Sequence, residues 1–414
     1  MKALCSIALI LGSISTAAAL PHLLNRRHTP PPQPPPPLRL PQHRGFITLE
    51  EHWTSPAILS VSDTNPLLPY TQSRSATLAP ALRDLGALRL ASMAEGDIDV
   101  QVISVALAPS ALLSPSVARA SNDQLAAAIA ANTPSPSRFR AWAFLPMADP
   151  AAAARELERA VRELGFVGAL VDSRLDNGSF YDGAAYAVFW AKAQELGAPV
   201  YLHPTVPPGD SYGGGVPAAS VFAIDRGRYA PSSGSSSGSS GGPPETPDGY
   251  SYPLSAAVAL ATNAWGWHVD VGLHFLRLYA AGVFEAFPRL KIVLGHMGEA
   301  VPFMLERADG ILPAPLLPDI EGDDRRTTAA HPATLLEVYA RNVWITTSGF
   351  FSLNTMATVL RNTAVDRIMY SVDYPYSSNT RGKQFMEELR DSGLVSESEW
   401  LAIARGNAEE LLGL

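Results

Sequence analysis

The segment Lys291–Glu299, KIVLGHMGE, places a short apolar run directly before a group of polar residues. The run ends at Leu294, and His296 and Glu299 follow it closely. A continuous apolar run of this length is typical of a strand that is buried on both faces in a parallel sheet. The segment therefore predicts a buried strand whose end carries chemically active side chains.

Similar apolar runs occur along the whole chain, and amphipathic helical stretches separate most of them. The expected strands are Phe46–Glu50, Val100–Val105, Phe139–Pro146, Phe166–Val171, Pro199–Leu202, Lys291–Leu294, Val343–Thr346 and Arg367–Val372. The expected helices are Ser121–Ala131, Ala151–Leu164, Ala184–Leu196, Val271–Phe287, Ala333–Ala340 and Ser396–Leu412. Strands that alternate with helices in this number predict an α/β fold, a (β/α)8 TIM barrel. A doubly wound open sheet is the alternative.

Three other expected strands also end in polar residues. The first ends in Glu50-Glu51-His52, the fifth in His203-Pro204 and the last in Asp373-Tyr374-Pro375. The C-terminal ends of barrel strands surround the mouth at which active sites lie, so we expect these side chains to gather there. Side chains alternate along a strand, so Glu50 and His52 point to one face and can hold one ion, whereas Glu51 points to the other.

Each of these residues also has a purely structural interpretation. Glu50 and His52 can form a solvated strand end, and His203 can be a core histidine bonded to the backbone. His296 can lie in a glycine-rich turn, and Asp373 can start a turn before Tyr-Pro. Two further histidines, His268 and His274, lie in or beside an expected helix and are interpreted as packing residues. Of these two, His274 is the one we expect nearer the pocket.

Composition and charge narrow the function. The 414 residues are 47% hydrophobic and 17% charged, which indicates a folded protein with a sizeable core. A formal net charge of -8 argues against nucleic acid as a partner. Cys5 is the only cysteine, so any metal must be held by histidine, aspartate or glutamate.

The N-terminal residues 1–19 have the pattern of a secretory signal peptide. Lys2 precedes an apolar run from Ala3 to Leu11, and small residues follow through Ala19. The run is too short to span the roughly 30 Å of a bilayer core, and no other segment qualifies as transmembrane. We therefore expect a protein of the secretory pathway or a secreted one; an N-terminal helix or a retained anchor is the alternative.

The rest of the chain divides into a linker and one domain. Residues 20–44 are interpreted as a proline-rich linker, because Pro30–Pro41 holds eight prolines in twelve positions. The domain covers residues 45–414 and contains a flexible Ser/Gly-rich insertion around residues 232–247.

Five segments resemble one known family. They are ITLEEHW (47–53), GDIDVQVISV (96–105), VYLHP (200–204), RLKIVLGHMGE (289–299) and YSVDYPY (370–376). In order and spacing they resemble the metal-dependent decarboxylase branch of the amidohydrolase superfamily, which includes dihydroxybenzoate, γ-resorcylate and 6-methylsalicylate decarboxylases. The resemblance extends from about Gly45 to the C-terminus.

The resemblance implies roles for the polar residues at the strand ends. Glu50, His52, His203 and Asp373 match the ligands of one divalent metal, with zinc expected first and manganese or magnesium as alternatives. His296 and Glu299 match a catalytic histidine and its acid, and Asp373 is the expected proton donor. Hydrolases of the superfamily often hold two metals through a lysine at the end of the fourth strand. Phe166–Arg174 has no lysine, which favours one metal.

The resemblance also implies substrate and subunit contacts. Arg307, in FMLERAD, matches an arginine that reaches the substrate region or a neighbouring subunit; a surface salt bridge is its structural interpretation. A homo-oligomer is implied as well. Trp53, Phe350 and Tyr376 are the aromatic candidates for stacking on a substrate ring.

The predicted function is non-oxidative decarboxylation of a small aromatic acid with an ortho hydroxyl, of the salicylate type, such as 6-methylsalicylate, in secondary metabolism. No redox cofactor is expected, because the electrons of the broken bond stay on the ring. A metal-dependent hydrolase or lactonase on the same barrel is the first alternative. A secreted binding protein without catalytic activity is the second.

Overall fold

The computed structural model describes residues 44–62, 78–105, 113–132, 138–205, 254–315 and 332–414. The predicted signal peptide, the Pro30–Pro41 stretch and the Ser/Gly-rich insertion lie outside these residues. Arg44–Leu414 forms one compact unit. In its described part, no helix has both the length and the apolar character needed to cross a membrane.

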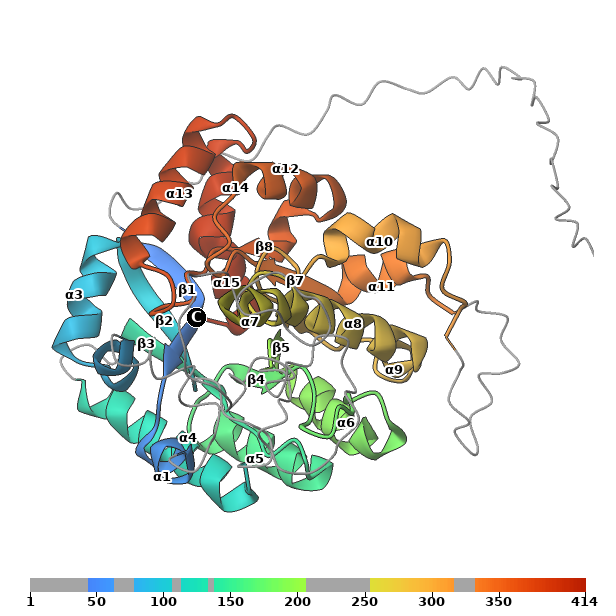
Figure 1. Cartoon of the computed structure of the whole chain (residues 1–414), viewed down its shortest axis with the longest axis horizontal. Coiled ribbons are helices and arrows are strands. Elements are labelled where there is room, and N and C mark those ends of the chain that lie inside the picture. The colour runs from blue at the N-terminus through green and yellow to red at the C-terminus, as the bar shows by residue number, and fades with distance from the viewer. Residues whose placement is uncertain (1–43, 63–77, 106–112, 133–137, 206–253, 316–331) are drawn as a thin grey trace, which may run out of the picture. The chain divides into compact units, whose positions relative to one another are not determined.

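Eight parallel strands form the centre of this unit (Figure 1). They are β1 (Phe46–Trp53), β2 (Ile98–Val105), β3 (Phe139–Ala143), β4 (Gly168–Asp172), β5 (Val200–His203), β6 (Ile292–Leu294), β7 (Val343–Thr346) and β8 (Ile368–Met369). Each strand pairs with the next one along the chain. A doubly wound sheet would reverse this order at a switch point, so the sequential order confirms the predicted (β/α)8 barrel.

Helices follow the strands and surround them (Figure 1). Between β1 and β5 they are α1 (Pro56–Ser62), α3 (Ala87–Glu95), α4 (Pro115–Ala131), α5 (Pro150–Glu163) and α6 (Ala187–Leu196). Between β5 and β7 they are α7 (Leu254–Ala261), α8 (Gly266–Ala280), α9 (Val283–Ala286), α10 (Val301–Asp309) and α11 (Leu335–Asn342). The last are α12 (Leu353–Asn362), α13 (Asn379–Asp391), α14 (Glu397–Leu401) and α15 (Asn407–Leu412), with a π-helical turn at Ala402–Gly406.

Local signals in the sequence set several helix ends. Asp149 caps α5 by accepting a hydrogen bond from the backbone of Ala152, and Pro150 occupies the first turn, where it is tolerated. Thr334 and Glu337 form a reciprocal capping box at the start of α11. The helix expected over Val271–Phe287 is divided into α8 and α9, because Gly282 adopts a left-handed conformation with φ 74°.

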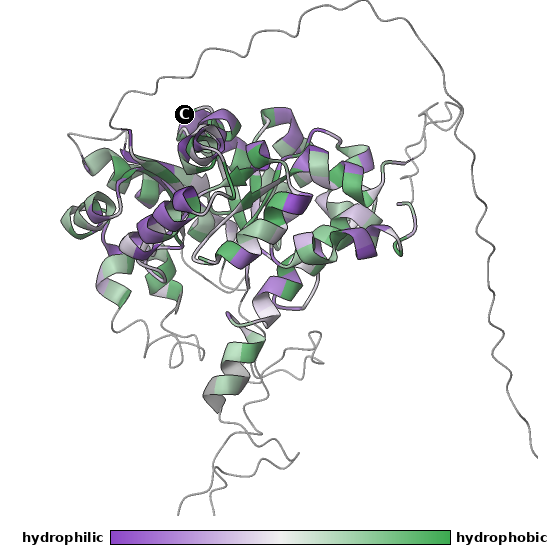
Figure 2. Ribbon diagram, turned by 90° about the horizontal axis from the view of Figure 1, so that it is seen from above, coloured by the Kyte–Doolittle hydropathy of each residue, from purple (hydrophilic) through white to green (hydrophobic). Residues whose placement is uncertain are grey.

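The buried side chains form two main layers. One cluster includes Ile47, Leu49, Val102, Trp142, Leu170, Tyr201, Val293 and Met369, residues contributed by strands around the barrel. The larger cluster packs the opposite strand faces against the helices, and Figure 2 shows that these helices carry both hydrophobic and hydrophilic residues. Tyr201 belongs to the first layer, so His203, two residues later, points to the same side of the sheet.

A bulge in β1 sets the direction of its polar end. Thr48 pairs with Gln101 and Glu51 pairs with Ile103, so β1 has one extra residue between these two pairs. The extra residue allows Leu49 to pack in the first layer while Glu50 and His52 still face the same centre. β1 thus continues as a buried strand to Trp53 instead of ending at Glu50 as expected.

Side chains join β1 to β8 across the bulge. The Ser371 hydroxyl accepts hydrogen bonds from the backbone N–H groups of Leu49 (3.1 Å) and Glu50 (2.8 Å). The buried Glu51 carboxylate accepts from the backbone of Val372 (3.1 Å) and Tyr374 (3.0 Å). Glu51 therefore points away from Glu50 and His52, as alternation predicts, and connects the first strand to the last.

Replacing Ser371 by alanine should lower the free energy of unfolding by about 2–4 kcal/mol, because two buried N–H groups lose their acceptor. Ser60, which is exposed and donates a local hydrogen bond to the carbonyl of Ala57, provides the control. Ser60→Ala should change stability by about 0.5 kcal/mol or less. Urea denaturation of both variants measures the difference. Equal free energies of unfolding for the two variants would show that the Ser371 hydroxyl does not stabilise the junction between β1 and the chain after β8.

Candidate metal centre and active site

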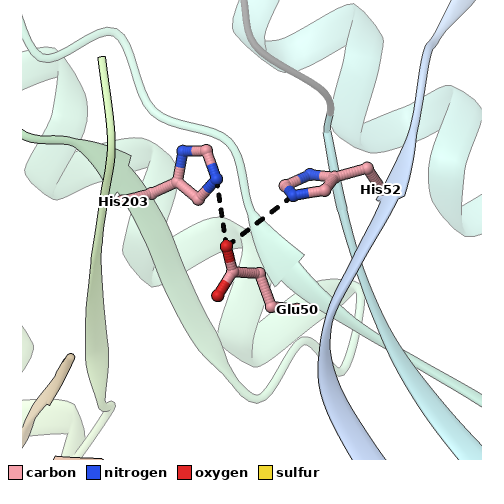
Figure 3. Close-up of side chains that lie close together, drawn as sticks. All are labelled: Glu50, His52 and His203. Carbon is pink, nitrogen blue, oxygen red and sulfur yellow. Dashed lines mark ion pairs between the residues drawn. The ribbon is translucent and has the colours of Figure 1, made fainter. Parts of the chain in front are cut away.

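Four side chains from the strand ends converge on one point. Nε2 of His203 lies 3.2 Å from Oε1 of Glu50, and Nε2 of His52 lies 3.8 Å from the same oxygen (Figure 3). Oδ1 of Asp373, which follows β8, lies 3.0 Å from Nε2 of His52. The barrel thus brings together the four residues that the sequence proposed as metal ligands.

Unpaired atoms at this point indicate what the cluster can hold. Among the residues that the structure describes, Oε1 of Glu50 and Nε2 of His52 are buried and make no hydrogen bond of normal geometry, although other members of the cluster lie within ion-pair distance of both. A buried polar atom without a partner is costly, so such atoms are usually satisfied by water or an ion. Two carboxylates and two imidazoles form a mixed oxygen and nitrogen set that suits a divalent metal. The residues present therefore fit one divalent ion.

Neighbouring hydroxyl groups orient these donors. Tyr201 donates a hydrogen bond to Oε2 of Glu50, which leaves Oε1 for the ion. Oγ of Ser104 lies 3.0 Å from Nδ1 of His52, which leaves Nε2 for the ion. Burial raises the pKa of Tyr201 well above its ordinary value, so its hydroxyl stays protonated and can donate. Neither Tyr201 nor Ser104 was among the site residues predicted from the sequence. Tyr201 could have been found, because it lies two residues before His203 on the same strand and therefore points to the same side.

In this cluster, contacts between opposite charges shift the pKa values in the direction opposite to that of burial. Burial by itself would raise the pKa of Glu50, but the positive charge of His296 and the contacts of His203 and His52 lower it well below its ordinary value. Burial would lower the pKa of His52, yet the nearby carboxylates of Asp373 and Glu50 raise it to about 9. A metal ligand must be a neutral imidazole, so ion binding would release the His52 proton.

The loop after β6 holds His296 beside the cluster. Nδ1 of His296 lies 2.7 Å from Oε1 of Glu299, and its Nε2 lies 3.8 Å from Oε1 of Glu50 and 3.8 Å from Oδ2 of Asp373. Glu299 thus orients the ring, and the other nitrogen faces the metal position. This arrangement suits an acid or base next to a metal.

The backbone of this loop is strained. His296, Met297, Gly298, Glu299 and Ala300 all have positive φ angles, between 44° and 86°. Left-handed conformations cost about 1–2 kcal/mol for each residue other than glycine. A hydrogen bond of 2.8 Å from the Met297 backbone to the Thr346 carbonyl helps to hold the turn. Strain at this place is typical of a functional site.

Gly295 is required for close approach at the start of the same loop. A Cβ atom there would lie 2.8 Å from Oε2 of Glu50 and 2.9 Å from the Tyr201 hydroxyl. Any larger side chain would displace the hydrogen bond that orients Glu50.

His268, and not His274, lies at the site. Nδ1 of His268 is 2.6 Å from Oε2 of Glu299. His274 is fully buried, and its ring packs against Tyr181 with centroids 5.0 Å apart. Six residues separate the two histidines, about one and two thirds of a helical turn, so they face different directions on α8. The sequence expectation that favoured His274 is therefore reversed.

The four residues proposed to contact substrate have different surroundings. The Tyr376 ring lies 5.4 Å from the His52 ring, edge to face. Phe350 is 44% exposed, and Arg307 is exposed on α10. Trp53 is 5% exposed within the outer core, and its indole N–H donates to the Arg83 carbonyl. Trp53 follows His52 by one residue, so alternation turns it away from the metal position.

The strand β4 ends in an aspartate, Asp172. Asp172 pairs in register with His203, so both side chains point to the same side of the sheet. Burial, together with the charge of Asp176, raises the pKa of Asp172 to about 8. A protonated carboxyl group is a poor metal ligand.

A (β/α)8 barrel whose strand ends surround one point with two histidines and two carboxylates has the architecture of a mononuclear metal-dependent enzyme. The family model described as Amidohydrolase matches residues 87–414. The chain is 44% identical to "Decarboxylase orsB" of Emericella nidulans, over 88% of this chain and 96% of that protein. It is 32% identical to a "Gamma-resorcylate decarboxylase" of Rhodococcus jostii, over 90% and 99% of the two chains.

A solved structure shows the same fold. It is a dihydroxybenzoic acid decarboxylase from Polaromonas sp. JS666 with bound manganese and the inhibitor 2-nitroresorcinol. The TM-score is 0.64 at 30% identity, with 90% of this chain and 97% of that chain covered. This protein therefore belongs to the Amidohydrolase family and, within it, to the divalent-metal-dependent decarboxylases of aromatic acids. The resemblance, the fold and the enzyme class predicted from the sequence are confirmed.

Two histidine variants should separate metal binding from acid-base chemistry. His52→Ala should lose most of the bound metal, because it removes a ligand. His296→Ala should keep a metal content near that of the unmodified protein and lose activity by about 10²-fold or more. Metal analysis of both purified variants after reloading measures the first effect. Loss of metal in the His296 variant would show that His296 is a ligand.

Proposed function

We propose that this protein decarboxylates, without oxidation, an aromatic acid that has a hydroxyl group ortho to its carboxylate. The substrate class is that of salicylate, such as 6-methylsalicylate, and the setting is secondary metabolism. The position of Asp373 carries the proposal. Its carboxylate contacts the proposed metal ligand His52 at 3.0 Å and faces His296 at 3.8 Å. The Asp373 carboxyl group thus lies between the proposed metal position and His296.

The relatives support this substrate class. One is named for γ-resorcylate, and another was solved with 2-nitroresorcinol, an aromatic inhibitor in which a nitro group lies between two hydroxyls. A carboxylate and its neighbouring hydroxyl present two oxygens close together, which is the pattern that a single divalent ion can bind.

Glu50, His52, His203 and Asp373 would hold the ion, which would supply Lewis-acid chemistry at the site. Asp373 gives a proton to the ring carbon that bears the carboxylate. That carbon becomes tetrahedral, the bond to the carboxylate breaks, and its electron pair returns to the ring as CO₂ leaves. His296, oriented by Glu299, donates a hydrogen bond to the charge that develops on the ring oxygen. The balance is one proton consumed and one CO₂ released.

A screen of aromatic acids tests this function directly. Protein reloaded with Zn²⁺, Mn²⁺ or Mg²⁺ should release CO₂ from at least one salicylate-, resorcylate- or orsellinate-type acid, and the most active ion identifies the metal. Matched acids without an ortho hydroxyl should react at least about 10²-fold more slowly, because they offer one oxygen fewer to bind and orient. Asp373→Asn should be inactive. No CO₂ from any of these acids, or products that have gained water, would refute the proposal.

We also propose that the enzyme enters the secretory pathway, on the strength of the signal-like residues 1–19. N-terminal sequencing of active protein from its natural source should find a start near Leu20. An intact Met1 on the active enzyme would contradict the proposal.

A further inference from the structure

Glu299 bonds to two histidines at once. Its Oε1 lies 2.7 Å from Nδ1 of His296, and its Oε2 lies 2.6 Å from Nδ1 of His268. Glu299 is 1% exposed, whereas the His268 side chain is 20% exposed. Nε2 of His268 lies 3.1 Å from the carbonyl of Asn263, an exposed residue. The three side chains form a continuous path of short contacts from the surface to His296.

The close packing of α8 on the loop after β6 allows the contact between His268 and Glu299. A Cβ atom at Gly272 would lie 2.7 Å from the Glu299 carbonyl oxygen, so only glycine allows the helix to come this close. Gly272 lies four residues after His268 and therefore on the same helix face. The face that carries both residues packs directly on the loop after β6.

The proposed reaction needs such a path, and the inference rests on that proposed function. Each turnover transfers one proton to the substrate ring and releases CO₂, so one proton must return from water before the next turnover. Glu50 and His52 are fully buried, and the Asp373 side chain is only 18% exposed, so a substrate bound against it in the proposed reaction would cover it. A path from behind His296 would restore the proton without requiring the mouth to be open.

We propose that His268 is a proton-transfer residue that links the His296–Glu299 pair to solvent. His268 gives its Nδ1 proton to the Glu299 carboxylate, and Glu299 passes one proton to Nδ1 of His296. His296 gives its Nε2 proton to Asp373, whose Oδ2 lies 3.8 Å away, and His268 regains a proton from water. Imidazole suits this role because one nitrogen can accept a proton while the other donates one. The net change is one proton moved inward, with only N–H and O–H bonds broken and formed.

The first test compares His268→Ala and His268→Gln with the unmodified enzyme, and Leu273→Ala, an exposed position on α8, is the control. In dilute buffer, both His268 variants should lower the steady-state kcat by at least about tenfold with unchanged KM and metal content. The first turnover should stay fast, because that proton is already in place. Added imidazole should restore the rate in proportion to its concentration. Leu273→Ala should behave like the unmodified enzyme.

Glutamine separates proton transfer from positioning. Its amide can still donate a hydrogen bond to Glu299, but it cannot carry a proton. A purely structural role would therefore let His268→Gln keep its activity. Full activity in His268→Gln, or a slow first turnover that imidazole does not restore, would overturn the proposal.

A second measurement does not depend on turnover. In protein labelled with ¹⁵N in its histidines, the imidazole N–H proton of His296 should exchange with water at least about tenfold more slowly in His268→Gln than in the unmodified protein. Equal exchange rates would refute the path even if the substrate had not been found. A different outcome would refute only the proposed function: no acid releases CO₂, yet the His296 proton still exchanges more slowly in His268→Gln than in the unmodified protein.

Discussion

The site depends on the seam between β1 and β8. In a parallel barrel these two strands come from opposite ends of the chain, and no turn connects them. Here the Ser371 hydroxyl accepts hydrogen bonds from two backbone N–H groups of the β1 bulge. The Glu51 carboxylate accepts hydrogen bonds from two backbone N–H groups of the chain after β8. Glu50 and His52 lie on one side of this seam and Asp373 on the other, so closing the barrel also brings together three of the four proposed metal ligands.

Several features of the site oppose folding, and the packed barrel around them compensates. The cluster buries charged groups, and within the described part of the chain Oε1 of Glu50 and Nε2 of His52 make no hydrogen bond. The loop after β6 keeps consecutive residues in left-handed conformations. Such strained or charged groups persist only where the surrounding structure holds them in place. Here the strands that lead into the site consist of fully buried apolar residues, such as Ile292–Leu294 of β6. The same rigidity fixes the distances on which the proposed metal binding and proton transfer depend.

Much of the fold and of the metal site could be predicted because both depend on local pattern. Short apolar runs separated by amphipathic segments indicate buried parallel strands, and their C-terminal ends must share one face of a barrel. Glu50, His52, His203 and Asp373 each lie at the end of such a run, so topology alone brings them together. The ends of elements were less predictable: β1 continues through Glu51 and His52 because tertiary contacts bury both residues.

By itself, the sequence determined the barrel, its strand order and the four side chains at its mouth, since these follow from periodicity and from position along each strand. Only the tertiary structure decided how those side chains are aimed and supported. The β1 bulge, the hydrogen bond from Tyr201 to Glu50 and the approach of His268 to Glu299 all join residues distant in sequence or depend on the angle at which a helix packs. No periodic pattern records such contacts, because they arise when separately formed elements meet in three dimensions.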